Sequence, residues 1–231
     1  MSKRVTLAAV CILFRLPCYP QFLPDLQAKS PAEYDAYLDA LDGPTLEKGA
    51  SFELAFPHSA LRLPVCELMA KAFRSEGRAD EAVAAASRGL AIAPDYIPLL
   101  VELADLLANG PRDLDRAATS AQRALELLQT AKAPLRVSPN DWLTATAGLR
   151  ARAHSALGMV RFKRDDPAGA ILQFEAALGQ RSPGDPAIHY RLGRLYVLFG
   201  RTAEAKVQLQ EAARAGDKVL RDLANAALAA L

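Results

Sequence analysis

The sequence has few of the residues that most enzymes and metalloproteins use at their sites. Its 231 residues include three cysteines and three histidines, and no P-loop, dinucleotide-binding glycine pattern or G-x-S-x-G motif occurs. His58, His154 and His189 are isolated, and none is spaced as a metal-ligand pair. We therefore predict no catalytic residue, no metal site and no cofactor, and we expect that the chain is not an enzyme.

Aromatic residues and net charge are also scarce. Aromatic residues make up 6% of the chain, which disfavours a large β-sandwich core, and the formal net charge of +2 is low for nucleic-acid binding. Cys11, Cys18 and Cys66 show neither paired spacings nor a zinc pattern. Cys66 falls at an apolar position of a predicted helix, where a buried thiol acting as a small hydrophobe is favoured over a redox role.

Long hydrophobic runs are missing as well. The apolar run from Val5 to Phe14 is too short for a membrane-spanning helix, which needs about 20 residues. Because it follows Lys3 and Arg4, this order resembles a secretory signal over residues 1–24, although no A-x-A-like cleavage site follows it. An unstructured start or a misassigned start codon is the alternative, so an exported, periplasmic location and a cytoplasmic one both stay open.

What the sequence does contain is an internal repeat. Gly158 and Gly193 are 35 residues apart, and so are Ala170 and Ala205, within the matching segments LGMVRFKRDDPAGAILQFEAAL and LGRLYVLFGRTAEAKVQLQEAA. A period of this size indicates stacked helical hairpins, with small residues where the two helices approach each other. Ala82 and Ala117 are again 35 residues apart, whereas the step from Ala117 to Ala170 is 53 and indicates an insertion.

The spacing of these residues resembles the tetratricopeptide repeat family. Its features are Leu-Gly on the first helix, Ala near the start of the second, a large apolar residue four positions later and Ala three after that. The resemblance covers residues 63–217 and implies an all-α fold, an α-solenoid of stacked helix-turn-helix tetratricopeptide repeats with a C-terminal capping helix. The tract QAKSPAEYDAYLDAL after an export-like segment is similar to bacterial members.

This pattern divides the chain into six segments. We expect a signal or unstructured segment over residues 1–24, a degenerate N-terminal hairpin over 25–62 and two repeat units over 63–129. A loop with extra helical length follows over 130–150, then two further units over 151–217 and a capping helix over 218–231. Ser30-Pro31-Ala32-Glu33 predicts a capped helix start. Asp165-Asp166 before Pro167 favours helix capping over acid catalysis, and the equivalent repeat places of His154 and His189 favour packing.

The family resemblance implies a concave groove lined by the first helix of each unit, which usually binds an extended peptide or a partner helix. The residues that repeat position places in this groove are Glu67, Lys71, Arg74, Glu102, Asp105, Arg152, Met159, Phe162, Lys163, Tyr190, Arg191, Arg194 and Leu198. The C-terminal half of this set is basic and partly aromatic, which suits a partner with acidic residues or a free C-terminal carboxylate. The alternative is a solvated face whose long side chains cover apolar helix surface.

Two functions follow from these expectations. The first is a non-enzymatic scaffold that binds a peptide or helix of another protein in the groove. The second is a structural or regulatory docking subunit of an enzyme complex that uses its convex face. Neither involves nucleic acid or a transmembrane helix.

Overall fold

The computed structural model of the chain describes residues 28–42, 45–111, 113–133, 137–180 and 184–231, and these form helices without any strand. The predicted signal segment, residues 1–24, lies outside the described residues. The first two helices are α2 (Pro31–Leu41) and α3 (Leu46–Ala55). Four hairpins and a terminal helix follow: α4 (Arg62–Ser75) with α5 (Ala79–Ile92), α6 (Ile97–Asn109) with α7 (Leu114–Thr130), α8 (Pro139–Lys163) with α9 (Pro167–Leu178), α10 (Pro186–Leu198) with α11 (Thr202–Ala215), and α12 (Lys218–Ala229).

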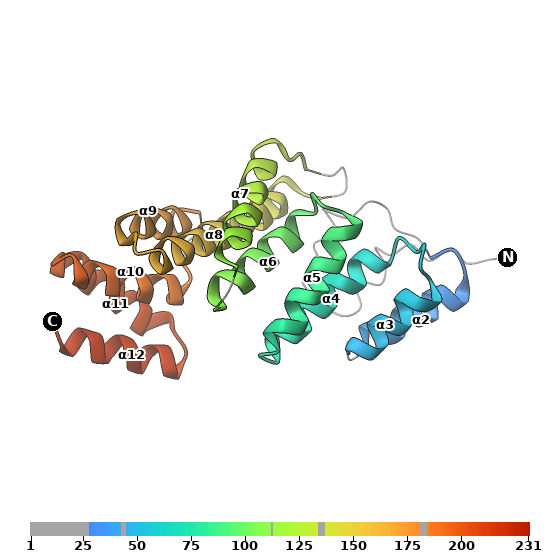
Figure 1. Cartoon of the computed structure of the whole chain (residues 1–231). Coiled ribbons are helices and arrows are strands. Elements are labelled where there is room, and N and C mark those ends of the chain that lie inside the picture. The colour runs from blue at the N-terminus through green and yellow to red at the C-terminus, as the bar shows by residue number, and fades with distance from the viewer. Residues whose placement is uncertain (1–27, 43–44, 112, 134–136, 181–183) are drawn as a thin grey trace.

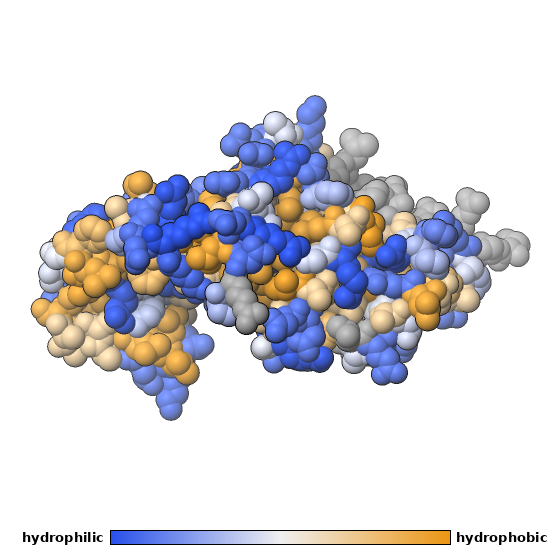
Figure 2. Space-filling view, in the orientation of Figure 1, coloured by the Kyte–Doolittle hydropathy of each residue, from blue (hydrophilic) through white to orange (hydrophobic). Residues whose placement is uncertain are grey.

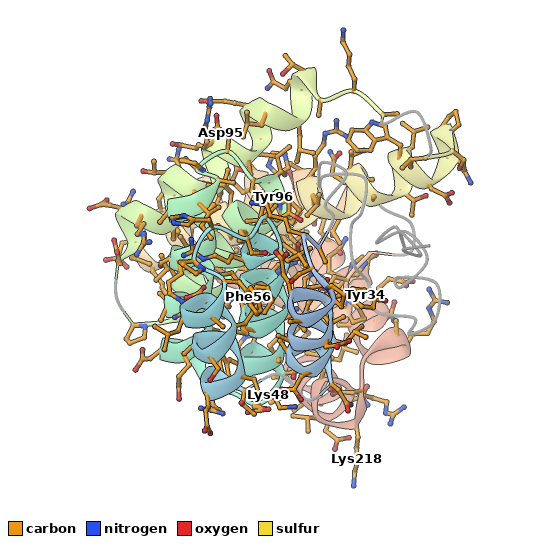
Figure 3. The ribbon with its side chains drawn as sticks, turned by 90° about the vertical axis from the view of Figure 1, so that its right-hand side faces the viewer. Tyr34, Lys48, Phe56, Asp95, Tyr96 and Lys218 are labelled. Atoms are coloured by element: carbon orange, nitrogen blue, oxygen red, sulfur yellow. The ribbon has the colours of Figure 1, made fainter. Side chains whose placement is uncertain are left out.

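The hairpins stack one upon the next into a solenoid, as the sequence predicts. Each first helix, here called an A helix (α4, α6, α8 and α10), packs against its own second helix, or B helix (α5, α7, α9 and α11). Figure 1 shows the stack running from α2 and α3 at one end to α12 at the other. Figure 3 views the stack from the α2 end and shows Lys218, the first residue of α12, pointing outward. No helix in the described part of the chain is long and apolar enough to cross a membrane.

Small residues occupy the closest approaches between A and B helices. A Cβ atom added to Gly158 of α8 would lie 2.7 Å from Cε1 of Phe174 in α9. In the next hairpin, a Cβ at Gly193 would lie 2.8 Å from Cγ of Leu209. Because real Cβ contacts are not this short, the glycine and the large residue facing it specify the spacing of each hairpin together. The matching pair in two hairpins explains the 35-residue repeat of the sequence.

Helix starts and turns follow the local sequence. The Ser30 hydroxyl accepts a hydrogen bond from Glu33 N at 3.1 Å, which caps α2. Asp166 Oδ1 accepts one from Gly169 N at 2.8 Å and caps α9, as predicted. The hydrogen bond from Arg161, followed by that from Gly169, lowers the pKa of Asp166. Asp165 has a φ of 56°, so it adopts the left-handed conformation that glycines adopt in two of the other turns.

The core is continuous from α2 to α8 and is followed by a smaller cluster over α9, α10 and α11. Met159 of α8 packs against both clusters and so links them. Cys66 is fully buried in α4, as predicted, and its thiol donates to Glu53 Oε1 at 3.0 Å. Burial, aided by this bond, raises the pKa of the thiol to about 12.

Two histidines occupy equivalent positions in successive hairpins. His154 Nδ1 lies 2.9 Å from Gln173 Oε1, and His189 Nδ1 lies 2.6 Å from Gln208 Oε1. Each histidine therefore bonds the glutamine of its own B helix, which fits the predicted packing role. Among the described residues, no group of histidine, cysteine and acidic side chains could hold a metal ion.

Candidate protein-binding groove

Helices α8 and α10, with Phe174 of α9, line an apolar pocket of about 240 Å³ on the groove side. We call it the apolar pocket, and it is lined by Met159, Phe162, Phe174, Tyr190, Arg191, Arg194, Leu195 and Leu198. Six of these eight residues are groove residues predicted from repeat position. Phe162 is 45% exposed and Leu198 is 71% exposed, so apolar surface is open to a partner.

A second and larger cavity, of about 650 Å³, extends from the apolar pocket toward the middle of the stack. Its main polar side chains come from four A helices, and we call it the polar cleft. They are Arg74 of α4, Asp105 and Asn109 of α6, Arg152 and Ser155 of α8, and Arg191 of α10, and the carboxylate of Asp185, which caps α10 through Ala187 N, lies in the same lining. Because Arg191 lines both cavities, the apolar pocket and the polar cleft are contiguous.

Ion pairs neutralise the cations in the α4 to α8 part of the polar cleft. Glu102 is 1% exposed, and it accepts a hydrogen bond from Arg152 Nη2 at 2.8 Å. The same guanidinium donates to Asp105 Oδ2 at 3.2 Å. Burial alone would lower the pKa of Arg152, but the charges of Glu102 and Asp105 outweigh it, so the pKa is raised and the guanidinium stays charged.

Arg74 completes this group from α4. Its Nε lies 2.8 Å from Glu102 Oε1, and its Nη1 lies 3.6 Å from Asp105 Oδ2. The first contact is an ion pair without a directed hydrogen bond, since Glu102 Oε1 accepts none from the residues described. Two carboxylates therefore face two guanidinium groups, and this part of the cleft carries little net charge.

The cations beside the apolar pocket have uncharged partners. Arg191 donates to Asn109 Oδ1 at 3.1 Å and to Ser155 Oγ at 3.4 Å. Arg194 donates to the Tyr190 hydroxyl at 3.1 Å, and its guanidinium lies 6.0 Å from that ring. Among the residues described, neither arginine forms an ion pair. No ion pair among the described residues therefore neutralises Arg191 or Arg194 at this end of the groove.

Lys163 lies near the same arginines, at the end of α8. Its Nζ donates to Gly110 O at 2.5 Å, and in the described structure it has no carboxylate partner. Burial, and then the charge of Arg191, lower its pKa. Repulsion between two cations is the expected result where no anion lies between them.

Glu67 and Lys71 lie apart from both cavities. Glu67 is 2% exposed, accepts a hydrogen bond from the Tyr96 hydroxyl and forms an ion pair with Lys71 in the same helix. The Glu67 carboxylate is therefore bonded within the stack and does not face the groove. Figure 3 shows Tyr96 among the helices, whereas the neighbouring Asp95 lies toward the outside.

Twelve lining residues of the two cavities were not included in the sequence prediction, among them Phe174, Leu195, Asn109 and Ser155. Phe174 was identified as the large residue of a B helix, but only the structure shows that its ring also reaches the apolar pocket. Leu195 lies outside the A-helix positions that define the groove, whereas Asn109 and Ser155 occupy the repeat positions of Leu198 and Tyr190 but were not selected. Asn109 and Ser155 matter because they position Arg191, and no sequence spacing connects them to it.

Comparison with known proteins matches part of the sequence to a family and finds solved structures with a similar fold. Residues 161–231 match the tetratricopeptide repeat family model, and no curated protein matches the chain. Similar solved structures include BtubC (BKLC) from P. vanneervenii, 19% identical, covering 84% of this chain and 76% of that one with a TM-score of 0.56. TTC0263, a thermophilic TPR protein of Thermus thermophilus, is 20% identical over 86% and 93% of the two chains, with a TM-score of 0.51. The MamA RS-1 ArsTM double mutant is 16% identical over 86% and 98%, with a TM-score of 0.52. At these identities the likeness concerns the fold.

Proposed function

We infer that the chain is a protein-interaction scaffold, because residues 161–231 match the tetratricopeptide repeat family model and the described chain has the stacked-hairpin fold of a solved TPR protein. We propose that it binds an acidic peptide or helix of another protein in the concave groove and that it catalyses no reaction itself. The segment would place an apolar side chain in the apolar pocket and a carboxylate beside Arg191 and Arg194.

One observation carries this proposal: unneutralised positive charge borders an exposed apolar pocket. Arg74 and Arg152 already face carboxylates, but Arg191 and Arg194 have only uncharged partners. A carboxylate forms shorter and stronger hydrogen bonds with guanidinium than a neutral oxygen does, so it would replace those partners. Arginine and aromatic side chains around a pocket are also the composition of binding hot spots.

A pull-down with the full chain tests the groove. Arg191→Glu with Arg194→Glu should weaken partner binding by about 100-fold or more, since each charged hydrogen bond contributes about 1.5–3 kcal/mol. The matched control is Lys132→Glu with Lys206→Glu, which makes the same change of charge at two exposed residues that line neither cavity. If the Arg191 and Arg194 double variant retains every partner, the C-terminal part of the groove does not bind them.

A second candidate uses the convex face. Leu172 of α9 and Val207 of α11 are 65% and 55% exposed and stand 35 residues apart, at equivalent places of two B helices. This repeated exposed apolar position favours docking of an enzyme subunit on the B helices. Cross-links from a bound partner to Arg88, Arg123 and Gln173, with none to the A helices, would support the convex face and contradict the groove.

A further inference from the structure

Helix α12 lies in the position of a further A helix. Asp185 caps α10 by accepting from Ala187 N at 2.8 Å, and Asp217 caps α12 by accepting from Leu220 N at 2.9 Å. Shifting α10 by these 32 residues superimposes the inward-facing residues of the two helices. They are Ile188, Leu192, Leu195 and Tyr196 in α10, and Leu220, Ala224, Ala227 and Leu228 in α12, all buried or half-buried.

The same shift identifies the groove side of α12. Positions 187, 191, 194 and 198 of α10 correspond to Val219, Leu223, Ala226 and Ala230, all of which are exposed. Val219 is 69% exposed and Leu223 is 47% exposed. Spacings of four, three and four place these residues in one stripe that runs along the helix to its C-cap, Ala230. Where α10 presents arginines to the groove, α12 therefore presents an apolar stripe.

The other free side of α12 is polar. By the same shift, Arg221 and Asn225 correspond to His189 and Gly193, the α10 positions that face a B helix. Terminal helices of solenoids need such a polar outer side for solubility. The apolar stripe is not explained by that role, because it lies on the groove side. Figure 2 shows hydrophobic surface gathering toward the C-terminal end of the stack.

We propose that α12 extends the groove, and that the occupant is an amphipathic helix with carboxylates opposite Arg191 and Arg194 and large apolar side chains over Val219 and Leu223. This inference rests on the proposed function and specifies its partner. Charge complementarity predicts carboxylates in the partner helix at this place, since Arg191 and Arg194 have no carboxylate partner in the described structure. The small side chains of Ala226 and Ala230 let a helix approach closely.

Helix geometry gives the spacing of the two features in the partner. Packed helices lie about 8–10 Å apart, so the step from α10 to α12 is about 10 Å. A partner helix rises 1.5 Å per residue, so about seven residues, or two turns, separate its carboxylates from its apolar residues. An extended peptide covers the same distance in about three residues, because it advances about 3.3 Å per residue.

The test uses a library of random 16-residue peptides displayed on phage, with the full chain as bait. We expect enriched peptides in which acidic residues precede or follow large apolar residues by about two helical turns. Enrichment of peptides with a separation of about three residues would overturn the helical occupant. Failure to enrich any peptide would overturn both this inference and the proposed function.

Variants then separate the two proposals, with affinity for one enriched peptide measured by fluorescence anisotropy. Val219→Asp with Leu223→Asp should weaken binding at least tenfold, and the matched control Leu54→Asp with Leu143→Asp, at two exposed leucines that line neither cavity, should not. Val219→Ser with Leu223→Ser repeats the test if circular dichroism shows that the first variant is unfolded. Unchanged affinity in these α12 variants, with loss in Arg191→Glu and Arg194→Glu, overturns only the inference. Unchanged affinity in all of them overturns the proposed function as well.

Discussion

Replacing Glu102 by glutamine tests the ion pairs of the polar cleft. The substitution keeps the shape of the side chain but removes the charge that faces Arg152 and Arg74. A hydrogen bond to a charged group contributes about 1.5–3 kcal/mol, which applies to the 2.8 Å bond from Arg152. The ion pair with Arg74, whose side chain is 45% exposed, adds about 0–1 kcal/mol. Asp105 stays near both arginines and offsets part of the loss, so we expect destabilisation of about 2 kcal/mol.

Urea unfolding followed by circular dichroism measures this change. The exposed Glu126→Gln is the control, and it should change the free energy of unfolding by less than about 0.5 kcal/mol. A double-mutant cycle with Arg152→Met should give a coupling of about 1.5 kcal/mol to Glu102→Gln. If the coupling is near zero, or if Glu102→Gln unfolds like the native chain, then the buried carboxylate does not hold α6 and α8 together and the reasoning fails.

Three further predictions concern the interior. Gly158→Val should destabilise the chain by about 1–3 kcal/mol, because even its Cβ would lie 2.7 Å from the Phe174 ring; thermal unfolding measures this. Tyr96→Phe should cost about 1–3 kcal/mol, since it removes the hydroxyl that donates to buried Glu67; urea unfolding checks it. Cys66, with its pKa raised from 9.0 to about 12, should resist a thiol reagent at pH 8 until urea unfolds the chain, and its contribution to stability should be full below pH 9 and lost between pH 9 and 12.

Controls make these predictions specific. Gly179→Ala should leave the melting temperature nearly unchanged, because an added Cβ there meets only ordinary contacts at 3.5 Å. An equal effect of Gly179→Ala and Gly158→Val would show that close packing is not the cause. The thiol experiment needs Cys11→Ser and Cys18→Ser so that only Cys66 reacts. Fast labelling of the native chain would contradict the burial of that thiol.

The fold could be predicted because each close approach between helices leaves a signature in the sequence. Gly158 and Gly193 are small because Phe174 and Leu209 face them, and this pairing recurs at a fixed interval. The apolar pocket was also predictable in part, since residues such as Tyr190 follow from repeat position once α10 is aligned.

The charges of the groove could not be predicted in the same way. Arg152 and Glu102 are 50 residues apart, on either side of the inserted segment 130–150, so the 35-residue repeat does not connect them. Repeat position alone also placed Glu67 in the groove, although the Tyr96 hydroxyl bonds its carboxylate within the stack. The apolar stripe of α12 was missed because the final helix was assigned only a capping role.

The hydrogen bond from Arg191 to Asn109 joins α10 to α6 and passes over α8 between them. A contact that skips one helix shortens when the solenoid coils and breaks when it straightens, so it acts as a tether on curvature. An exposed hydrogen bond of this kind contributes about 1 kcal/mol, which is less than 2RT at room temperature, so it opens often. The stack can therefore flex by releasing one side chain, and a ligand carboxylate that takes Arg191 from Asn109 would widen the coil. The curvature of the solenoid and ligand binding in the groove would then change together, because both depend on the partner that Arg191 takes.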